Sequence, residues 1–585
     1  MFKRLSLVLP YLARYRRHLL FGLFAIAATN ALALLAPLVL RRAINRIESG
    51  ASPEDLLADA LLILGLAAGS GVFRFLVRRS VIWASRKIEY DLRGDLFAHI
   101  ATLDGPFFDR TPTGDIITRA TSDIEQARML IGPGIMQGTN TLLVTLFAIP
   151  LMVHLDWRLA AYAFVPLPLL ALATNLLGGI AHRRSLAVQE SFSHLSASVQ
   201  ESLSGIRVIK AYAREADRSR RFRGDSTEYF RLNMHLTKLW GAFMPLMTAL
   251  AGSAVILVLY FGGGAVIDGR IDLATLIAFA VYMGMLIWPM IALGWVVSLY
   301  QRGTASLRRL GEIFDTQPKV VDPPADRAMT PPPSGALEFR HLSFAYNGEG
   351  NGNGGEVSDV SFVIAPGETV AVAGPTGSGK STVAQLLWRR YAVPDAMMFL
   401  GGVDANRVPL GAWRSRIAMV GQEPFLFSQS LRGNIAFGAH DLGDDDLVSV
   451  SHMAAFDKDV QEFPRGYDTI VGERGITLSG GQKQRATLAR ALAIDAEILV
   501  LDDAFSAVDA QTEGEILDRL AELFGTRIIV LISHRIATLR RADRVLFFER
   551  GRLADSGTHD DMMAHDGAYA RWVRREALRE ELERM

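Results

Sequence analysis

The residues best suited to chemistry lie in the stretch 374–382, which reads Gly-Pro-Thr-Gly-Ser-Gly-Lys-Ser-Thr. It follows the apolar run 369–373 and opens a sequence that favours a helix, which is the context of a phosphate-binding P-loop. Glycines let backbone N–H groups surround phosphates at a helix N-terminus, a lysine adds a cation, and the next hydroxyl can ligate Mg²⁺. We therefore predict that ATP binds at Gly374, Gly377, Ser378, Gly379, Lys380, Ser381 and Thr382, and that Ser381 also ligates Mg²⁺.

Two further motifs accompany this loop and argue against a chance glycine-rich turn. The apolar run 498–501 ends in Asp502, where a buried strand would present a second ligand for Mg²⁺. The stretch 478–482 reads Leu-Ser-Gly-Gly-Gln and is called the signature below. It precedes a sequence that favours a helix, so it is expected to form a second anion-binding helix N-terminus, or anion cradle. The cradle residues are Ser479, Gly480, Gly481 and Gln482. One nucleotide cannot easily fill both cradles of one chain, so the pattern predicts that two such domains meet head to tail.

With these motifs in place, the chain resembles the ABC exporter family over nearly its whole length. The resemblance implies an α-helical membrane bundle, with six spans and long cytoplasmic extensions, fused to an α/β P-loop ABC ATPase domain. It also assigns four roles: adenine stacking, a glutamine loop that reaches Mg²⁺ and the catalytic centre, a D-loop aspartate and a catalytic switch histidine. The matching residues are, in that order, Tyr346, Gln422, Asp509 and His534. The alternatives are an ordinary strand aromatic at Tyr346 and an ordinary loop histidine at His534.

Three more segments carry the resemblance. Residues 472–475 match the exporter cross-linking loop, and 107–123 and 209–215 match the two intracellular coupling regions.

The catalytic position departs from the family pattern. The family usually has Glu directly after the aspartate that matches Asp502, where it polarises the attacking water, and this chain has Asp503. A displacement of about 1 Å can cost on the order of 100-fold when a catalytic group must be in line. We therefore expect the P-loop site of this chain to bind ATP but to hydrolyse it slowly, unless a small backbone shift makes Asp503 an adequate base. Because the signature is intact and would act on a partner's nucleotide, this asymmetry predicts a heterodimer with an unlike ABC half-transporter.

The N-terminal half is rich in stretches that could cross a bilayer. Stretches of more than 20 residues without Asp, Glu, Lys, Arg or His are 19–40, 129–153, 159–181, 239–267 and 273–301. A bilayer core of about 30 Å needs roughly 20 apolar residues as a helix. A sixth stretch, 56–83, is weaker because Asp59 and three arginines interrupt it. The six expected spans are about 18–41, 56–83, 127–153, 158–181, 239–267 and 272–300.

The connections between these spans alternate between very short and very long. Segments 154–158 and 268–272 are tight turns, whereas 86–128 and 182–238 are charged and have the spacing of helices that continue beyond the bilayer. A proline-rich segment then separates two regions of different composition. We expect a transmembrane domain at 1–318, a linker at 319–335 and a nucleotide-binding domain at 336–585.

Composition narrows the class of protein. The chain has 585 residues with 62 basic and 61 acidic side chains, so its net charge of +1 gives no support for nucleic-acid binding. It contains no cysteine, which excludes disulfides and thiolate chemistry. An even number of spans places both termini on one side of the membrane. Because the C-terminal domain needs cytoplasmic ATP, we expect a multi-pass protein of the cell (inner) membrane with a cytoplasmic ATPase domain.

These expectations combine into ATP-driven export by alternating access, with an amphipathic small molecule, a lipid or a peptide as substrate. A homodimeric exporter with slow hydrolysis and an ATP-gated channel or regulator on the same scaffold are the alternatives. An importer is less consistent with the fused domains, and the spans exclude a soluble ATPase. Arg74, Asn140 and Asn175 lie within or beside apolar spans and are weaker candidates for substrate contact, although Arg74 could instead snorkel to the interface.

Overall fold

The computed structural model describes residues 6–329, 335–346, 356–439, 441–472 and 478–584. The chain divides into two compact units, of which the first comprises Met1–Ala101 and Thr113–Thr316. The second unit comprises Thr102–Pro112 and Gln317–Met585. The segment Thr102–Pro112 therefore belongs by its contacts to the second unit, although the sequence places it between two parts of the first.

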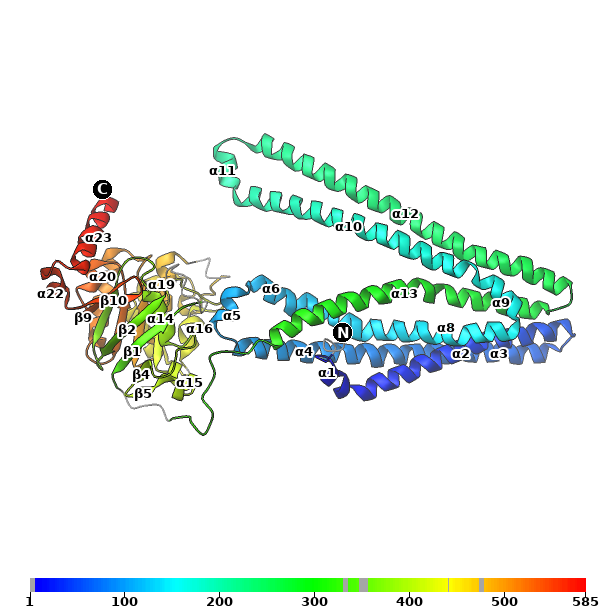
Figure 1. Ribbon diagram of the computed structural model, residues 1–585, viewed down its shortest axis with the longest axis horizontal. Coiled ribbons are helices and arrows are strands. Elements are labelled where there is room, and N and C mark those ends of the chain that lie inside the picture. The colour runs from blue at the N-terminus through cyan, green and yellow to red at the C-terminus, as the bar shows by residue number, and fades with distance from the viewer. Residues whose placement is uncertain (1–5, 330–334, 347–355, 440, 473–477, 585) are drawn as a thin grey trace. The chain divides into compact units, whose positions relative to one another are not determined.

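Long helices make up the first unit (Figure 1). Among the described residues, five continuous helices are long and apolar enough to cross a membrane: Arg16–Glu48, Pro53–Thr102, Thr113–Leu155, Glu215–Ile267 and Leu273–Phe314. The individual helices are α1 (Leu9–Arg14), α2 (Arg16–Glu48), α3 (Pro53–Val77), α4 (Trp83–Thr102), α6 (Thr113–Thr118), α7 (Ile124–Met129), α8 (Ile135–Leu155), α9 (Trp157–Phe164), α10 (Pro166–Ser204), α11 (Ile206–Ala211), α12 (Glu215–Ile267) and α13 (Leu273–Phe314). Short π-helical turns, η2 (Arg78–Ile82), η3 (Arg119–Asp123) and η4 (Leu130–Gly134), join several of them.

In two of the expected spans, the continuity of the helix differs from what the charges in the sequence suggested. The weak stretch 56–83 lies inside one continuous helix, Pro53–Thr102. The strongly apolar stretch 158–181 is divided between α9 and α10, which begins at Pro166. Proline has no N–H for the helical ladder, so a helix boundary at this point is physically favoured. The count of six spans therefore stays a prediction.

The acidic charge that weakened the second stretch is compensated inside the first unit. Asp59 is fully buried, and Arg42 and Arg46 both form ion pairs with its carboxylate. Because a buried carboxylate is tolerated only when it is paired, this cluster explains how an acidic residue can stand in an apolar helix. The long connection 182–238 is helical as expected, and α10 and α12 lie side by side in antiparallel directions (Figure 1).

Two sheets form the second unit. The larger sheet has the order β10-β9-β3-β8-β7-β6, in which the strands from β9 to β6 are parallel and β10 is antiparallel to its neighbour. The smaller sheet, in the order β2-β1-β4-β5, is antiparallel. The strands are β1 (Leu337–Phe344), β2 (Val357–Ile364), β3 (Thr369–Ala373), β4 (Met398–Leu400), β5 (Val403–Asp404), β6 (Ile417–Val420), β7 (Ile498–Asp502), β8 (Ile528–Ile532), β9 (Arg544–Glu549) and β10 (Arg552–Gly557).

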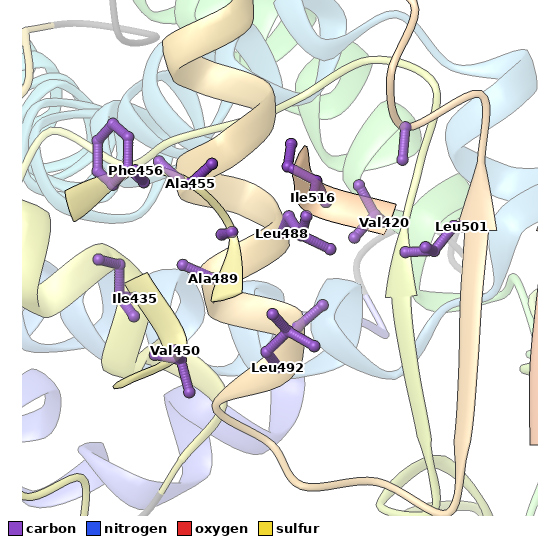
Figure 2. Packing of buried hydrophobic residues seen from close by; sticks show 14 of the residues in the cluster. Val420, Ile435, Val450, Ala455, Phe456, Leu488, Ala489, Leu492, Leu501 and Ile516 are labelled. Carbon is purple, nitrogen blue, oxygen red and sulfur yellow. The ribbon is translucent and has the colours of Figure 1, made fainter. Parts of the chain in front are cut away.

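Helices make up much of the rest of the second unit. They are α5 (Gly105–Arg110), α14 (Lys380–Leu387), α15 (Leu410–Arg414), α16 (Leu431–Ile435), α17 (Asp444–Met453), α18 (Asp457–Glu462), α19 (Gly480–Leu492), α20 (Ala510–Leu520), α21 (Ile536–Leu539), α22 (His559–Ala564) and α23 (Ala568–Arg584). Figure 2 shows one core, in which Leu488 and Leu492 of α19 pack with Val420 of β6, Leu501 of β7 and Ile516 of α20. This packing fixes α19 and the strand β7, so it positions both the signature and the acidic residues at the end of the strand.

Candidate nucleotide site

The P-loop joins the fully buried strand β3 to α14. Gly374 has a φ of 146°, and a Cβ atom there would lie 2.2 Å from the carbonyl oxygen of Phe548. Gly377 has a φ of 81°, and a Cβ atom there would meet no described heavy atom within 4 Å. Glycine is therefore required by both backbone and space at the first position, and by the backbone alone at the second.

Lys380 is held inside this loop. Its Nζ atom donates to the carbonyl oxygens of Gly374, at 2.8 Å, and Pro375, at 2.9 Å. Burial lowers the pKa of Lys380, and the carboxylates of Asp503 and Asp502 act in the opposite direction. The loop thus contains a cation that is only partly hydrated, which suits a group that must bind phosphate.

Asp502 and Ser381 form an oxygen pair beside the loop. The Ser381 hydroxyl donates to Oδ1 of Asp502 at 3.2 Å, and Asp502 is 4% exposed at the end of β7. Burial raises the pKa of Asp502 to about 6; the Ser381 hydrogen bond opposes this shift, and Asp503 adds to it. Carboxylate and hydroxyl oxygens are hard donors of the kind that Mg²⁺ prefers. The pair therefore offers oxygen donors that fit a Mg²⁺ site.

Asp503 and His534 follow adjacent strands and face each other. Asp503 has a φ of 47°, which Asp adopts more readily than most residues, and its N–H donates to the carbonyl oxygen of Ile532 at 3.0 Å. The Nδ1 atom of His534 lies 3.2 Å from Oδ1 of Asp503. This hydrogen bond raises the pKa of His534, because a carboxylate favours the charged imidazolium. The ends of β7 and β8 therefore hold a carboxylate and a basic side chain together.

Tyr346 lies beside the first turn of α14. Its hydroxyl is 2.8 Å from Oγ1 of Thr382, and either oxygen could donate. Tyr346 remains 37% exposed, so part of the side chain is open to a planar ligand. Gln422 is exposed in the loop that follows β6. Its assignment to Mg²⁺ and to catalysis stays a prediction.

The signature occupies the N-terminus of α19. Ser479 caps the helix, since its hydroxyl accepts the N–H of Gln482 at 3.2 Å and Gln482 Oε1 accepts the N–H of Ser479 at 3.0 Å. The Gln482 amide also donates to Asp459 at 3.0 Å. Ser479 and Gly480 are exposed. The signature is therefore a preformed and exposed helix N-terminus, which supports its prediction as an anion cradle.

The D-loop, residues 506–509, is bonded to α19. Asp509 caps α20 by accepting the N–H of Thr512 at 2.9 Å and its hydroxyl at 2.7 Å, and these bonds lower the pKa of Asp509. Gln484 is 2% exposed; it donates to Ser506 Oγ at 2.7 Å and accepts the N–H of Ala507 at 2.8 Å. Gln484 thus ties the signature helix to the D-loop.

Sequence reasoning missed Gln484 and Arg535. Arg535 donates to the carbonyl oxygen of Val508 at 3.1 Å and pairs with the buried carboxylate of Glu513. A usable signal existed for both residues, because Gln484 is a polar residue on the buried face of a helix and Arg535 directly follows the switch histidine. The bonds described so far join the P-loop to Asp502, Asp503 to His534, and the signature to the D-loop.

The expected roles of the cross-linking loop and of the three candidate substrate-contact residues stay predictions. Residues 473–475 of the cross-linking loop lie outside the described residues. Arg74 is exposed in α3 and Asn140 is half-buried in α8, while the side chain of Asn175 lies outside what the structure describes.

Most of the chain is similar to known proteins. Residues 19–290 match the family described as ABC transporter transmembrane region, and residues 357–506 match the family described as ABC transporter. The "Probable multidrug resistance ABC transporter ATP-binding/permease protein YheI" of Bacillus subtilis is 34% identical over 94% of each chain. The "Multidrug resistance-like ATP-binding protein MdlA" of Escherichia coli is 33% identical, covering 87% of this chain and 85% of its own.

A lipid transporter and a solved structure are also similar. The "ATP-dependent lipid A-core flippase" of Desulfotalea psychrophila is 30% identical over 95% of this chain and 96% of its own. A bacterial Atm1-family ABC exporter, solved with ATP bound, has a similar fold, with a TM-score of 0.77 over 97% of this chain and 99% of its own, at 24% sequence identity.

Proposed function

The chain belongs to the ABC transporter family as an exporter-type half-transporter with its own ATPase domain, and we propose that it exports substrate as one subunit of a heterodimer. In this proposal the dimer has one weak ATP site, formed around the P-loop of this chain, and one competent site, formed around the partner's P-loop. The observation that carries the proposal is Asp503. Its short carboxylate stands at the catalytic position, while the signature of the same chain is intact and exposed.

The site residues divide into binding and catalytic roles. Bound ATP supplies the phosphoanhydride bond whose hydrolysis resets the transporter, and Mg²⁺ neutralises charge on its phosphates. The P-loop backbone and Lys380 would hold the phosphates, and Ser381 and Asp502 would hold Mg²⁺. Tyr346 would stack on adenine, and Asp503 would orient water with His534 beside it.

The position of the signature supports the proposed partner. Ser479 opens a helix whose bonds run to Asp459 and to the D-loop rather than to the P-loop. A partner's nucleotide would therefore be the ligand of this exposed helix N-terminus. Closure of the two ATPase domains would favour one of two packings of the membrane helices, which is alternating access in energetic terms.

The substrate class is proposed from the relatives and from the membrane helices. The relatives named above include proteins described for multidrug resistance and for lipid A-core transport. We therefore expect an amphipathic small molecule or lipid, with a peptide as a further option. The ATPase domain would face the cytoplasm and the helices would cross the cell (inner) membrane.

Trapping with vanadate tests the weak site. The tagged chain, purified from its native membrane together with any bound partner, should bind 8-azido-ATP on both subunits. Vanadate should trap labelled nucleotide on the partner and only weakly on this chain, because trapping requires hydrolysis. A chain that purifies as a homodimer with full, substrate-stimulated ATPase activity and strong trapping would overturn the heterodimer.

Transport in inside-out vesicles tests the direction and the energy source. ATP should drive accumulation of a fluorescent amphipathic dye against its gradient, and Lys380→Ala should abolish it. Conductance without accumulation would contradict export and favour the channel alternative.

A further inference from the structure

Tyr391 packs against the tyrosine proposed to bind the base. It follows α14 and is buried, with 5% of its surface exposed. Its ring centroid lies 5.2 Å from that of Tyr346 in an edge-to-face arrangement, with an interplanar angle of 87°. Phe344 completes the cluster, at 5.2 Å from Tyr346 and 5.4 Å from Tyr391. Edge-to-face aromatic pairs restrain each other's orientation, so Tyr391 limits the positions that the Tyr346 ring can adopt.

The hydroxyl of Tyr391 is fixed by α5. It donates to Oδ2 of Asp109 at 2.6 Å, and the Arg390 guanidinium donates to Oδ1 of the same carboxylate at 2.6 Å. Burial and this hydrogen bond raise the pKa of Tyr391 well above its ordinary value, so the hydroxyl keeps its proton and remains a donor. Hydrogen bonds to a charged acceptor are stronger than neutral ones. Both oxygens of Asp109 thus hold adjacent residues of the ATPase domain.

The backbone of α5 is fitted to the same place. Gly105 donates its N–H to the carbonyl oxygen of Arg390 at 3.2 Å. A Cβ atom on Gly105 would lie 2.7 Å from Cγ of Arg390 and 3.0 Å from the Arg390 carbonyl oxygen. The backbone of α5 therefore approaches the segment that carries Tyr391 as closely as glycine allows.

We propose that Tyr391 is a positioning residue for the base-stacking face of Tyr346, and that Asp109 of α5 sets its orientation. The contacts run without a break from Asp109 through Tyr391 and Tyr346 to Thr382 in α14. The inference rests on the proposed function, in which Tyr346 stacks on adenine. By linkage, a base bound at Tyr346 favours the same position of α5 that holds Tyr391 in place.

Comparing ATP with inorganic tripolyphosphate isolates the contribution of the base. In the full chain in lipid nanodiscs, Tyr391→Leu should weaken ATP binding about threefold to tenfold and leave tripolyphosphate binding unchanged. Tyr346→Leu should weaken ATP binding at least as much, and the double variant should be no weaker than Tyr346→Leu. A structural defect would instead weaken both ligands together.

Two variants that remove the hydrogen bond between Tyr391 and Asp109 test the role of Asp109. Tyr391→Phe keeps the ring and loses the hydrogen bond, so it should weaken ATP binding less than Tyr391→Leu. Asp109→Ala removes the same bond and should not add to the effect of Tyr391→Phe. Tyr569→Phe is the matched control, because it removes another buried hydroxyl, bonded to His559 at 2.7 Å, far from Tyr346 along the chain. It should leave the ratio of the two affinities unchanged.

The outcomes separate this inference from the proposed function. If Tyr346→Leu leaves ATP affinity unchanged, the adenine assignment fails and the inference fails with it. If Tyr346→Leu weakens ATP binding and Tyr391→Leu does not, only the positioning role fails. Equal weakening of ATP and tripolyphosphate by Tyr391→Leu would also overturn the positioning role. Tyr391→Leu could fail to fold, which its melting temperature would show. In that case the ATP and tripolyphosphate affinities of Tyr391→Phe and Asp109→Ala test the positioning role instead: both variants should weaken ATP binding alone, and no effect on ATP binding would overturn the role.

Discussion

The Nδ1 atom of His534 lies 3.2 Å from Oδ1 of Asp503, which joins the ends of two adjacent strands, β7 and β8. The residue before Asp503 is the buried Asp502, so two carboxylates and one imidazole meet where the nucleotide is proposed to bind. The hydrogen bond between Asp503 and His534 restricts the orientation of both side chains. A side chain as short as that of Asp503 cannot keep this bond and also reach further into the site.

Lengthening Asp503 should restore hydrolysis. Asp503→Glu adds the missing methylene, and we expect ATPase activity to rise by about tenfold to 100-fold, measured as phosphate release in lipid nanodiscs. Asp495→Glu is a matched control, because Asp495 also has a positive φ, of 52°, and is exposed outside the site. The control should leave activity unchanged. No gain from Asp503→Glu would contradict the weak-site hypothesis.

The charge of His534 should depend on Asp503. The hydrogen bond raises the pKa of His534 above its ordinary 6.5, so the stabilisation from the charged pair is complete below that pH and is lost as pH rises through the raised value. Replacing Asp503 by Asn should lower the pKa of His534. Titration of ¹³C-histidine-labelled protein by NMR, with His534→Gln to assign the signal, measures the shift. An unchanged His534 titration in the variant would show that the pair is not formed.

The buried carboxylate of Asp502 should make the nucleotide-free protein sensitive to pH. Its pKa rises from 3.8 to about 6, so between these values the folded chain holds a proton that the unfolded chain has lost, and stability falls as pH rises. At pH 7.5 the cost is at most about 3 kcal/mol. Asp502→Asn should therefore raise the melting temperature at pH 7.5 by several degrees and by only about a third as much at pH 4.5, where the folded carboxyl is still protonated. A similar shift at both values would exclude ionisation as the cause.

The two glycines of the P-loop should differ in tolerance. Gly374→Ala places Cβ against the Phe548 carbonyl at 2.2 Å, and we expect loss of folding or of ATP binding. Gly377→Ala meets only backbone strain, so it should cost about 1 kcal/mol and retain some ATP binding. Melting curves and ATP dissociation constants of both variants measure the difference. Equal tolerance would mean that the loop can move away from Phe548.

Sequence patterns predicted the membrane helices and the P-loop because each depends on local features. The stretch around Lys380 carries its own strand, turn and helix signals, and a run of uncharged residues predicts a helix wherever it occurs. The pairing of Asp59 with Arg42 and Arg46 depends on contacts between two helices, which neither stretch encodes alone. The bonds of Gln484 are of the same kind, because its partners lie 22 and 23 residues away along the chain, so its polar position on an apolar helix face could suggest a role but not these partners.

The segment Thr102–Pro112 has a consequence for biosynthesis. Asp109 is translated 281 residues before Arg390 and 282 before Tyr391. At about 5–20 residues per second, the ribosome needs about 15 to 60 s to produce these partners. The short helix α5 must therefore stay accessible while most of the membrane helices are inserted, and the ATPase domain can complete its fold only by capturing a segment made long before it.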